Sequence, residues 1–197
     1  MEVSLKSGNN GFVASVDSNG RLLTESVTLP VGFYEAEVGQ SFNINTDVVT
    51  LTTANKSAVM YVKNNSSEDL VISNLIYILG NSTGGTGDLR IDVLRNPTAG
   101  TIVDTATAIP VIENRNFGSN ITLNIDGYKG AEGATFTDGA LAITSLFASA
   151  ARRVALDIGD IILPNGASIG IDVTPQASNT NMDVMFAFSC YRVTLTV

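Results

Sequence analysis

Carboxylates are the side chains through which this sequence could carry out chemistry. Even spacing along a strand would place Asp88 with Asp92, and Glu35 with Glu37, on one face, and a third pair, Asp157 and Asp160, brackets Gly159. A glycosidase needs two such carboxylates in a cleft lined with aromatic side chains. The chain has no Trp and only five Tyr, so it is poorly equipped to stack a sugar. We therefore expect these groups to be solvated charges on strand faces.

Other catalytic chemistry finds little support in the residue types. The chain has no His, so a Ser-His-Asp or Cys-His mechanism and imidazole zinc ligation are excluded. Its one cysteine, Cys190, lies in an alternating apolar run and is expected to be a buried, inert thiol. The glycines of 80–88 lack the lysine of a phosphate-binding loop. A Ca²⁺ site using Asp88, Asp138 or Asp160 is the weaker alternative to our expectation of no metal, no cofactor and no enzymatic activity.

The charge of the chain limits its partners. The net charge is −8, whereas binding to DNA or RNA backbones requires clustered Lys and Arg, so we expect no nucleic acid partner. No apolar run approaches the roughly 20 residues of a membrane helix, and no signal-peptide pattern begins the sequence. Only 15% of the residues are charged. This low fraction suits a protein that buries part of its outer surface against other proteins.

Alternating apolar residues dominate the chain and predict strands. We expect about eight to ten strands with turn signals between them, which indicates an all-β fold, an antiparallel β-sandwich that is jelly-roll-like. The last strand, 182–191, should be central, with one face formed by Val184, Phe186, Phe188 and Cys190. The apolar run 70–80 should be covered on both faces, because it lies deep in the fold or because one face meets a partner subunit. In 88–96, alternation places Leu89, Ile91 and Val93 inward and Asp88, Arg90 and Asp92 in solvent.

The remaining segments divide the chain into two regions. Residues 1–32 carry short β-prone pieces between turn signals and predict an extended N-terminal arm or a small hairpin, with the first strand pair of the main sheet as the alternative. Residues 33–197 form the β-sandwich domain, with strands expected at 33–38 and 120–126. The segment 140–153 is either the one helix or a strand around Ile143.

Three stretches, Ala14–Thr28, Ser57–Val103 and Ile161–Tyr191, resemble structural proteins of tailed bacteriophage virions, in particular the β-sandwich proteins that decorate or complete the capsid. The resemblance implies a non-enzymatic protein that is made in the host cytoplasm, forms a homo-oligomer, expected to be a trimer, and binds the major capsid protein on the outer capsid surface. By this analogy, 12–28 would anchor the sandwich. The partner-binding residues would be Phe12, Val13, Val16, Arg21, Leu22 and Leu23.

A second interpretation belongs to a different class of protein. The chain could be the receptor- or carbohydrate-binding tip of a phage tail or fibre. Its recognition surface would then be the polar loops 81–87 and 128–139. A binding tip usually exposes aromatic side chains, and Tyr128 and Phe136 are the candidates in these loops.

Overall fold

The computed structural model describes residues 15–16, 22–23, 31–83, 88–147, 153–156, 160–176 and 180–193. The chain divides into two units, 1–31 and 32–197. In the first unit, β1 (Ser15–Val16) pairs antiparallel with β2 (Leu22–Leu23), and Val16 lies opposite Leu22. This pairing is that of a small hairpin. The predicted contact residues Phe12, Val13 and Arg21 lie outside the described residues.

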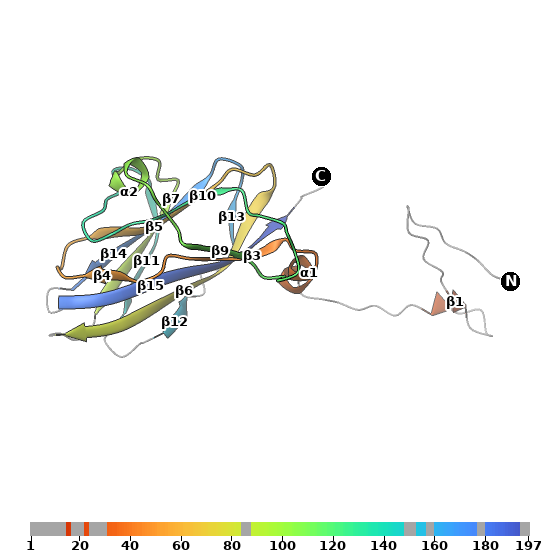
Figure 1. The fold of residues 1–197 in the computed structure, drawn as a ribbon, viewed down its shortest axis with the longest axis horizontal. Coiled ribbons are helices and arrows are strands. Elements are labelled where there is room, and N and C mark those ends of the chain that lie inside the picture. Colours follow the sequence, from red (N-terminus) through yellow and green to blue (C-terminus); the bar gives the residue numbers. More distant parts are fainter. Residues whose placement is uncertain are drawn as a thin grey trace. The chain divides into compact units, whose positions relative to one another are not determined.

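The second unit is an all-β sandwich of two antiparallel sheets, which confirms the predicted fold class (Figure 1). The first sheet has the order β11 (Ala140–Phe147), β7 (Leu89–Arg95), β14 (Ser168–Pro175), β5 (Ser57–Asn64), β10 (Ile125–Lys129), β8 (Thr107–Ala108). The second has the order β12 (Arg153–Leu156), β6 (Asp69–Thr83), β15 (Thr180–Val193), β3 (Ser41–Asn45), β9 (Val111–Asn114); β13 (Ile161–Leu163) also pairs with β6, and β4 (Val49–Leu51) with β15. Helices α1 (Val31–Glu37) and α2 (Thr101–Asp104) are short.

Neighbouring strands in each sheet come from distant parts of the chain. Strand β15 lies between β6 and β3, and β14 lies between β7 and β5. The predicted central position of the last strand is therefore confirmed. Its inward face is also as predicted, because Val184, Phe186, Phe188 and Cys190 are all buried. They pack with apolar residues of both sheets in one continuous core.

Strand β6 differs from its prediction. Leu70, Ile72, Leu75 and Tyr77 are buried in the core, but on the other face Ile76 and its neighbours are only half-buried and Asn74 is exposed. Within one copy of the chain, the long apolar run thus has one core face and one partly solvated face, so it does not lie deep in the fold. Cover of the second face by a partner subunit stays a prediction. The strand also continues to Thr83, beyond the predicted start of the loop at residue 81.

The outer face of the first sheet carries a third layer, made of α2 and the loop after β10. The Tyr61 ring stacks on the Tyr128 ring with centroids 5.6 Å apart, and Phe136 lies 6.2 Å from Tyr61. A Cβ on Gly170 would come within 2.7 Å of the Phe136 ring, so glycine allows this close packing. Tyr128 and Phe136 therefore pack against the sheet and do not form the exposed recognition surface that the sequence suggested.

Two carboxylates fasten this loop to the sandwich. Glu132 accepts hydrogen bonds from the backbone N–H and the hydroxyl groups of Thr52 and Thr53 at 2.6–2.8 Å. Asp138 accepts hydrogen bonds from the Thr98 hydroxyl at 2.5 Å and from the backbone N–H groups of Thr98 and Ala99 at 2.8 and 2.9 Å. These bonds favour the ionised form, so they lower the pKa of Glu132 to about 2 and lower that of Asp138.

Acid is expected to weaken the attachment of this loop. Because the pKa of Glu132 is lower in the folded protein than in the unfolded chain, its contribution is present above the unfolded pKa and is lost as pH falls through the folded pKa of about 2. We expect the melting temperature of the wild-type protein to fall between about pH 5 and pH 2. Glu132→Gln should melt lower at pH 7 and show a smaller decrease over that range. Equal pH dependence of the two proteins, measured by circular dichroism, would contradict this assignment.

Two predicted strands have other conformations. Residues 33–38 alternate in sequence, yet Val31–Glu37 forms helix α1, which ends where Gly39 takes a φ of +77°. A glycine in this conformation after Glu-Ala-Glu is a common helix stop. Residues 120–124 are irregular, and the strand predicted at 120–126 begins only at Ile125. The open choice at 140–153 is resolved as a strand over Ala140–Phe147.

Candidate interaction surface

Of the suggested carboxylate pairs, the structure contradicts one. Glu35 and Glu37 lie on helix α1, so residues two apart do not share a face. Asp157 lies outside the described residues. Asp92, predicted to be solvated, is 4% exposed, and its closest carboxylate across the sheet is Asp172 of β14, which is 1% exposed. Strand pairing with β14 and β11 on both sides of β7 is the reason that Asp92 is covered.

Each buried carboxylate has its own cation. The Arg90 Nε lies 2.9 Å from Asp92 Oδ1, which also accepts a hydrogen bond from the Thr144 hydroxyl at 2.7 Å. The Lys56 Nζ lies 2.6 Å from Asp172 Oδ2. Burial raises the pKa of Asp172, Lys56 opposes this shift and Asp92 adds to it. The cluster is balanced in charge and lies within the sheet, so we interpret it as a structural ion-pair network.

The remaining reactive groups also have structural environments. Burial raises the pKa of the Cys190 thiol to about 12, so the thiolate is not available near neutral pH, in agreement with the predicted inert thiol. Of the suggested Ca²⁺ ligands, Asp138 already binds the 98–99 backbone. Within the described part of the chain, no three His, Cys, Asp or Glu side chains gather in a way that could hold a metal ion.

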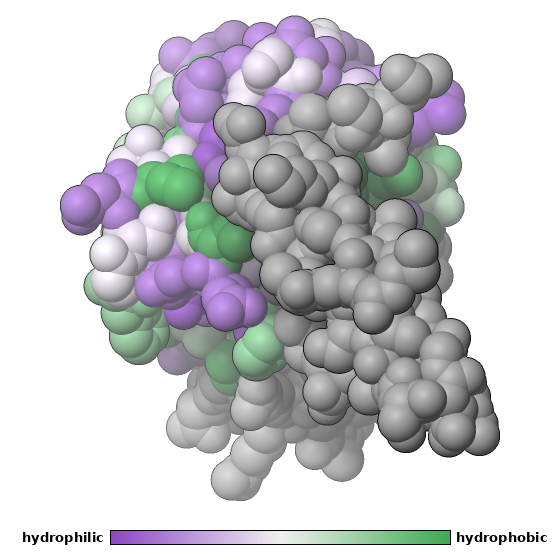
Figure 2. All heavy atoms as spheres, turned by 90° about the vertical axis from the view of Figure 1, so that its right-hand side faces the viewer, coloured by the Kyte–Doolittle hydropathy of each residue, from purple (hydrophilic) through white to green (hydrophobic). Residues whose placement is uncertain are grey.

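Exposed apolar side chains are more distinctive than the charged ones. Figure 2 looks at the side of the sandwich on which α1 lies in Figure 1, and hydrophobic residues are exposed there among hydrophilic ones. Phe117, in the loop after β9, is 97% exposed, and on α1 Phe33 and Tyr34 are more than half exposed. We call these three aromatic residues, together with Val38 and Ile121, the end patch.

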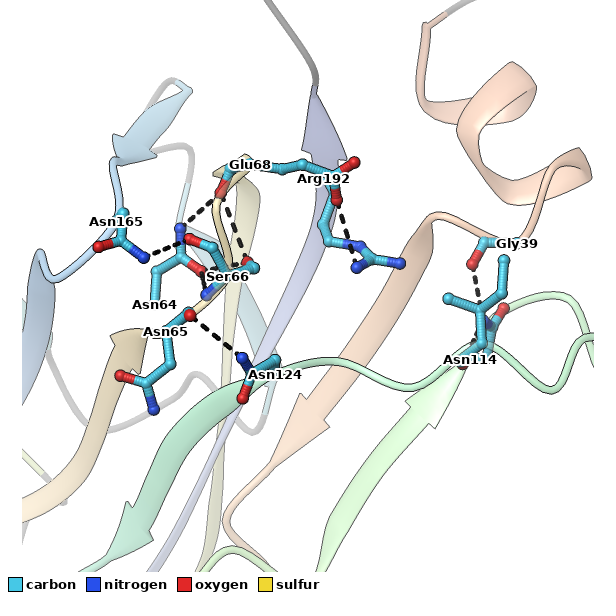
Figure 3. Close-up of polar contacts among 10 residues, drawn as sticks. Gly39, Asn64, Asn65, Ser66, Glu68, Asn114, Asn124, Asn165 and Arg192 are labelled. Atoms are coloured by element: carbon cyan, nitrogen blue, oxygen red, sulfur yellow. Dashed lines mark hydrogen bonds and ion pairs between the residues drawn. The ribbon is translucent and has the colours of Figure 1, made fainter.

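Hydrogen bonds from asparagine side chains hold the two parts of the end patch together. The Asn116 Nδ2 donates to the carbonyl oxygen of Glu37 at the end of α1, at 2.8 Å. The Asn114 Nδ2 donates to the Gly39 carbonyl oxygen at 2.8 Å, as Figure 3 shows, and to that of Ile121 at 3.0 Å. The loop after β9 is therefore fixed beside α1, which places Phe117 next to the helix that carries the other two aromatics.

The same close-up shows a second asparagine network that joins two turns of the sandwich (Figure 3). The buried Asn64 donates through Nδ2 to the carbonyl oxygens of Glu68 and Leu163, both at 2.8 Å. Asn165 donates through Nδ2 to the Ser66 carbonyl oxygen at 2.6 Å. These bonds satisfy backbone groups where strands end, so we assign them a structural role.

A pocket of about 430 Å³ adjoins the end patch. Its apolar lining comes from Phe42, Ile112 and Leu123, and its polar groups come from Glu113, Asn114, Ser119, Asn120 and Thr122. Ile121 belongs to both the pocket and the end patch. A concave apolar surface with a few convergent amide and hydroxyl groups is the usual form of a small-ligand site.

The sequence analysis placed the partner-binding residues elsewhere. Of its six candidates, Val16, Leu22 and Leu23 lie in the described strands β1 and β2, and no side chain of the six is described. The end patch was not predicted, because the alternating residues 33–38 indicated a strand and not the helix α1 that exposes Phe33 and Tyr34. One signal was present, since Phe117 is a large aromatic residue within the otherwise polar run Asn114–Asn120.

Comparisons with known proteins do not assign the chain to a family. No protein-family model matches the sequence, and a search of curated proteins finds no match. Among the described residues, neither helix has the length and apolar character needed to span a bilayer. The interpretation of the chain therefore depends on its residues and its structure.

Proposed function

We propose that this chain is a non-enzymatic structural protein of a bacteriophage virion that binds the outer surface of the capsid and reinforces or decorates it. Its partners are other copies of itself and the major capsid protein. The proposal extends the sequence resemblance described above. The structural observation that supports it best is the end patch, which exposes three aromatic side chains at the start of the sandwich.

The position of the end patch in the chain suits attachment to a surface. Helix α1 begins at Val31, where the N-terminal unit ends, so a contact through residues 1–31 continues in sequence into Phe33 and Tyr34. Aromatic residues are enriched in protein interfaces because they bury large area at low entropic cost. An N-terminal contact followed by the end patch would give two linked attachment points. Two linked contacts bind more tightly together than either does alone, because formation of one raises the effective concentration for the other.

Charge and composition agree with an outer position. A net charge of −8 is unfavourable beside a packaged genome, which attracts positive charge, and is harmless on the outside of a shell. With only 15% charged residues, contacts between such proteins carry a small desolvation cost. A capsid lattice would present many equivalent sites, so weak single contacts would still hold the protein.

Deleting residues 1–28 should abolish capsid binding and leave the sandwich folded. The deletion removes β1, β2 and every contact residue predicted from the sequence, while β3 to β15 keep their core. Binding would be measured by co-sedimentation with empty capsids of the virus that carries the protein, and folding by circular dichroism. If the truncated protein still saturates those capsids, attachment through the N-terminal unit is wrong.

A second candidate function is the receptor- or carbohydrate-binding tip of a phage tail or fibre. The observation that favours it is the 430 Å³ pocket, where amide and hydroxyl groups converge beside the exposed aromatic residues of the end patch. Aromatic faces and amide groups together are suited to bind sugar rings. The two functions differ in the location of the protein on the virion, which electron microscopy of labelled particles can determine.

A further inference from the structure

The two sheets end in strands of very different kinds. Strand β8 has two residues; β9 and β12 have four each and carry Glu113 and Arg153, respectively. Proteins commonly protect sheet edges in these ways, with short strands and charged residues. Strand β11 has eight residues, ALAITSLF, and contains no charged residue and no proline. Among the described residues it pairs only with β7, so its other side is an unprotected edge.

The exposed face of β11 carries two leucines and one threonine, Thr144, whose hydroxyl already donates to Asp92. A bulge between Leu141 and Ile143 shifts the register, so Leu141 pairs with Leu94 while Leu146 pairs with Arg90, both on the outer face of β7. Leu141 is 56% exposed and Leu146 is 68% exposed. Ile143 lies on the other face and packs against the core. The edge therefore presents unpaired backbone groups and two leucines on the same side of the sheet.

The apolar region continues across the open side of the sandwich. A cavity of about 400 Å³ lies between the β11–β7–β14 part of the first sheet and β13 of the second. Its walls include Ala142, Ile143 and Ile161, and Ile162 of β13 is more than half exposed. A second sheet edge that extends the first sheet would cover this cavity and remove these side chains from water.

We propose that β11 pairs edge to edge with β11 of a second copy of this chain. Two copies that each carry a charge of −8 repel each other, so a surface of self-contact should lack acidic groups. Neither β11 nor β13 contains one, and the nearby Asp92 is neutralised by Arg90. Because the surface formed by β11 and β13 has no acidic residue of its own, a second copy can approach closely there without strong charge repulsion.

Symmetry makes the pairing self-complementary. A two-fold axis perpendicular to the sheet brings the two β11 strands together antiparallel and keeps their outer faces on the same side. Leu141 and Leu146 of both copies then lie on the same face of the joined sheet, with Thr144 between them. The result is a dimer with a twelve-stranded sheet across it, since each copy contributes six strands (6 + 6). This differs from the trimer that the resemblance implies.

Leu146→Lys tests the proposal on the isolated full-length chain, without capsids, so its outcome is independent of the proposed function. A lysine on an edge strand opposes pairing with another strand and would introduce two buried positive charges into the symmetric contact, one from each copy. We expect the wild-type protein to sediment as a dimer at about 10 µM, and Leu146→Lys to raise the dissociation constant at least about tenfold. Val48→Lys introduces the same charge at an exposed apolar residue that lies neither in β11 nor in the end patch, and should leave the dimer intact. Melting curves would verify that both variants are folded.

Three results of analytical ultracentrifugation would overturn the proposal. The first is a monomeric wild-type protein at about 100 µM. The second is a dimer or trimer that Leu146→Lys leaves unchanged. The third is loss of the dimer on deletion of residues 1–28, because the partner at the edge would then be the N-terminal unit of a neighbouring copy. A dimer that survives this deletion and is lost in Leu146→Lys supports the proposal.

Discussion

Replacing Phe188 with alanine is expected to lower the free energy of unfolding by about 3–5 kcal/mol. The ring is 1% exposed, and its strand β15 is central, with Phe188 opposite Leu75 of β6 and Ile44 of β3. Loss of the ring removes buried apolar area and leaves a cavity that the neighbouring strands cannot close without breaking their pairing. Chemical denaturation followed by circular dichroism measures the change directly.

Phe117→Ala is the matched control, because it makes the same substitution at a ring that is almost fully exposed. Its expected change is within about 0.5 kcal/mol. An unchanged denaturation curve for Phe188→Ala would mean that the core lies elsewhere. A large loss for Phe117→Ala would mean that the end patch is part of the fold and not a free surface.

Gly130→Ala is expected to be the other strongly destabilising change, at about 3 kcal/mol, the upper part of the range for overpacking. A Cβ on Gly130 would overlap the carbonyl oxygen of Ala58, which belongs to the backbone of β5 and cannot rotate away. Relief would have to separate the end of β10 from β5 and weaken the hydrogen bond from Gly130 N–H to the Val59 carbonyl oxygen at 3.1 Å. Thermal and chemical denaturation would both register the loss.

Gly118→Ala provides the comparison for this glycine. A Cβ there would have only ordinary contact with Asn116 Oδ1 at 3.5 Å, and Gly118 has no positive φ that would strain an alanine. We expect its stability to stay within about 0.5 kcal/mol of the wild type. If Gly130→Ala and Gly118→Ala have the same stability, the close approach of β10 to β5 is incorrect.

The sandwich was predictable because most of its strands have one buried face. Alternation with a period of two determines which side chains of β15 and β7 enter the core, and Phe188, Leu89 and Ile91 are all buried as the pattern indicated. Strand order was not predictable in the same way. Whether β14 inserts between β7 and β5 depends on pairing between residues far apart in the chain, which a local pattern does not contain.

Local patterns failed where distant residues decide the conformation. Helix α1 has seven residues, and its end is fixed by Asn114 and Asn116 from the loop after β9, so alternation over 33–38 was misleading. Asp92 resembled a solvated strand residue because its cover, β11 and β14, comes from later parts of the chain. Burial of a charge is a tertiary property, and its counter-ions are visible only in the fold.

The sequence did not predict where the candidate surfaces lie. Low charge and the scarcity of catalytic residue types indicated a protein that works through its surface. The end patch required the fold, because Phe33 and Phe117 are 84 residues apart in sequence (117 − 33). The bond from Asn116 to the end of α1 places their two segments side by side. The free edge at β11 likewise required knowledge of which strand ends the sheet.

Locating the protein on the intact virus particle tests the central claim most directly. Particles purified from the source of this sequence would be labelled with an antibody against the sandwich and imaged by electron microscopy. The proposed function predicts copies on every facet of the capsid. Copies confined to the tail would support the recognition tip instead, and particles that carry no copies would contradict a structural role in the virion.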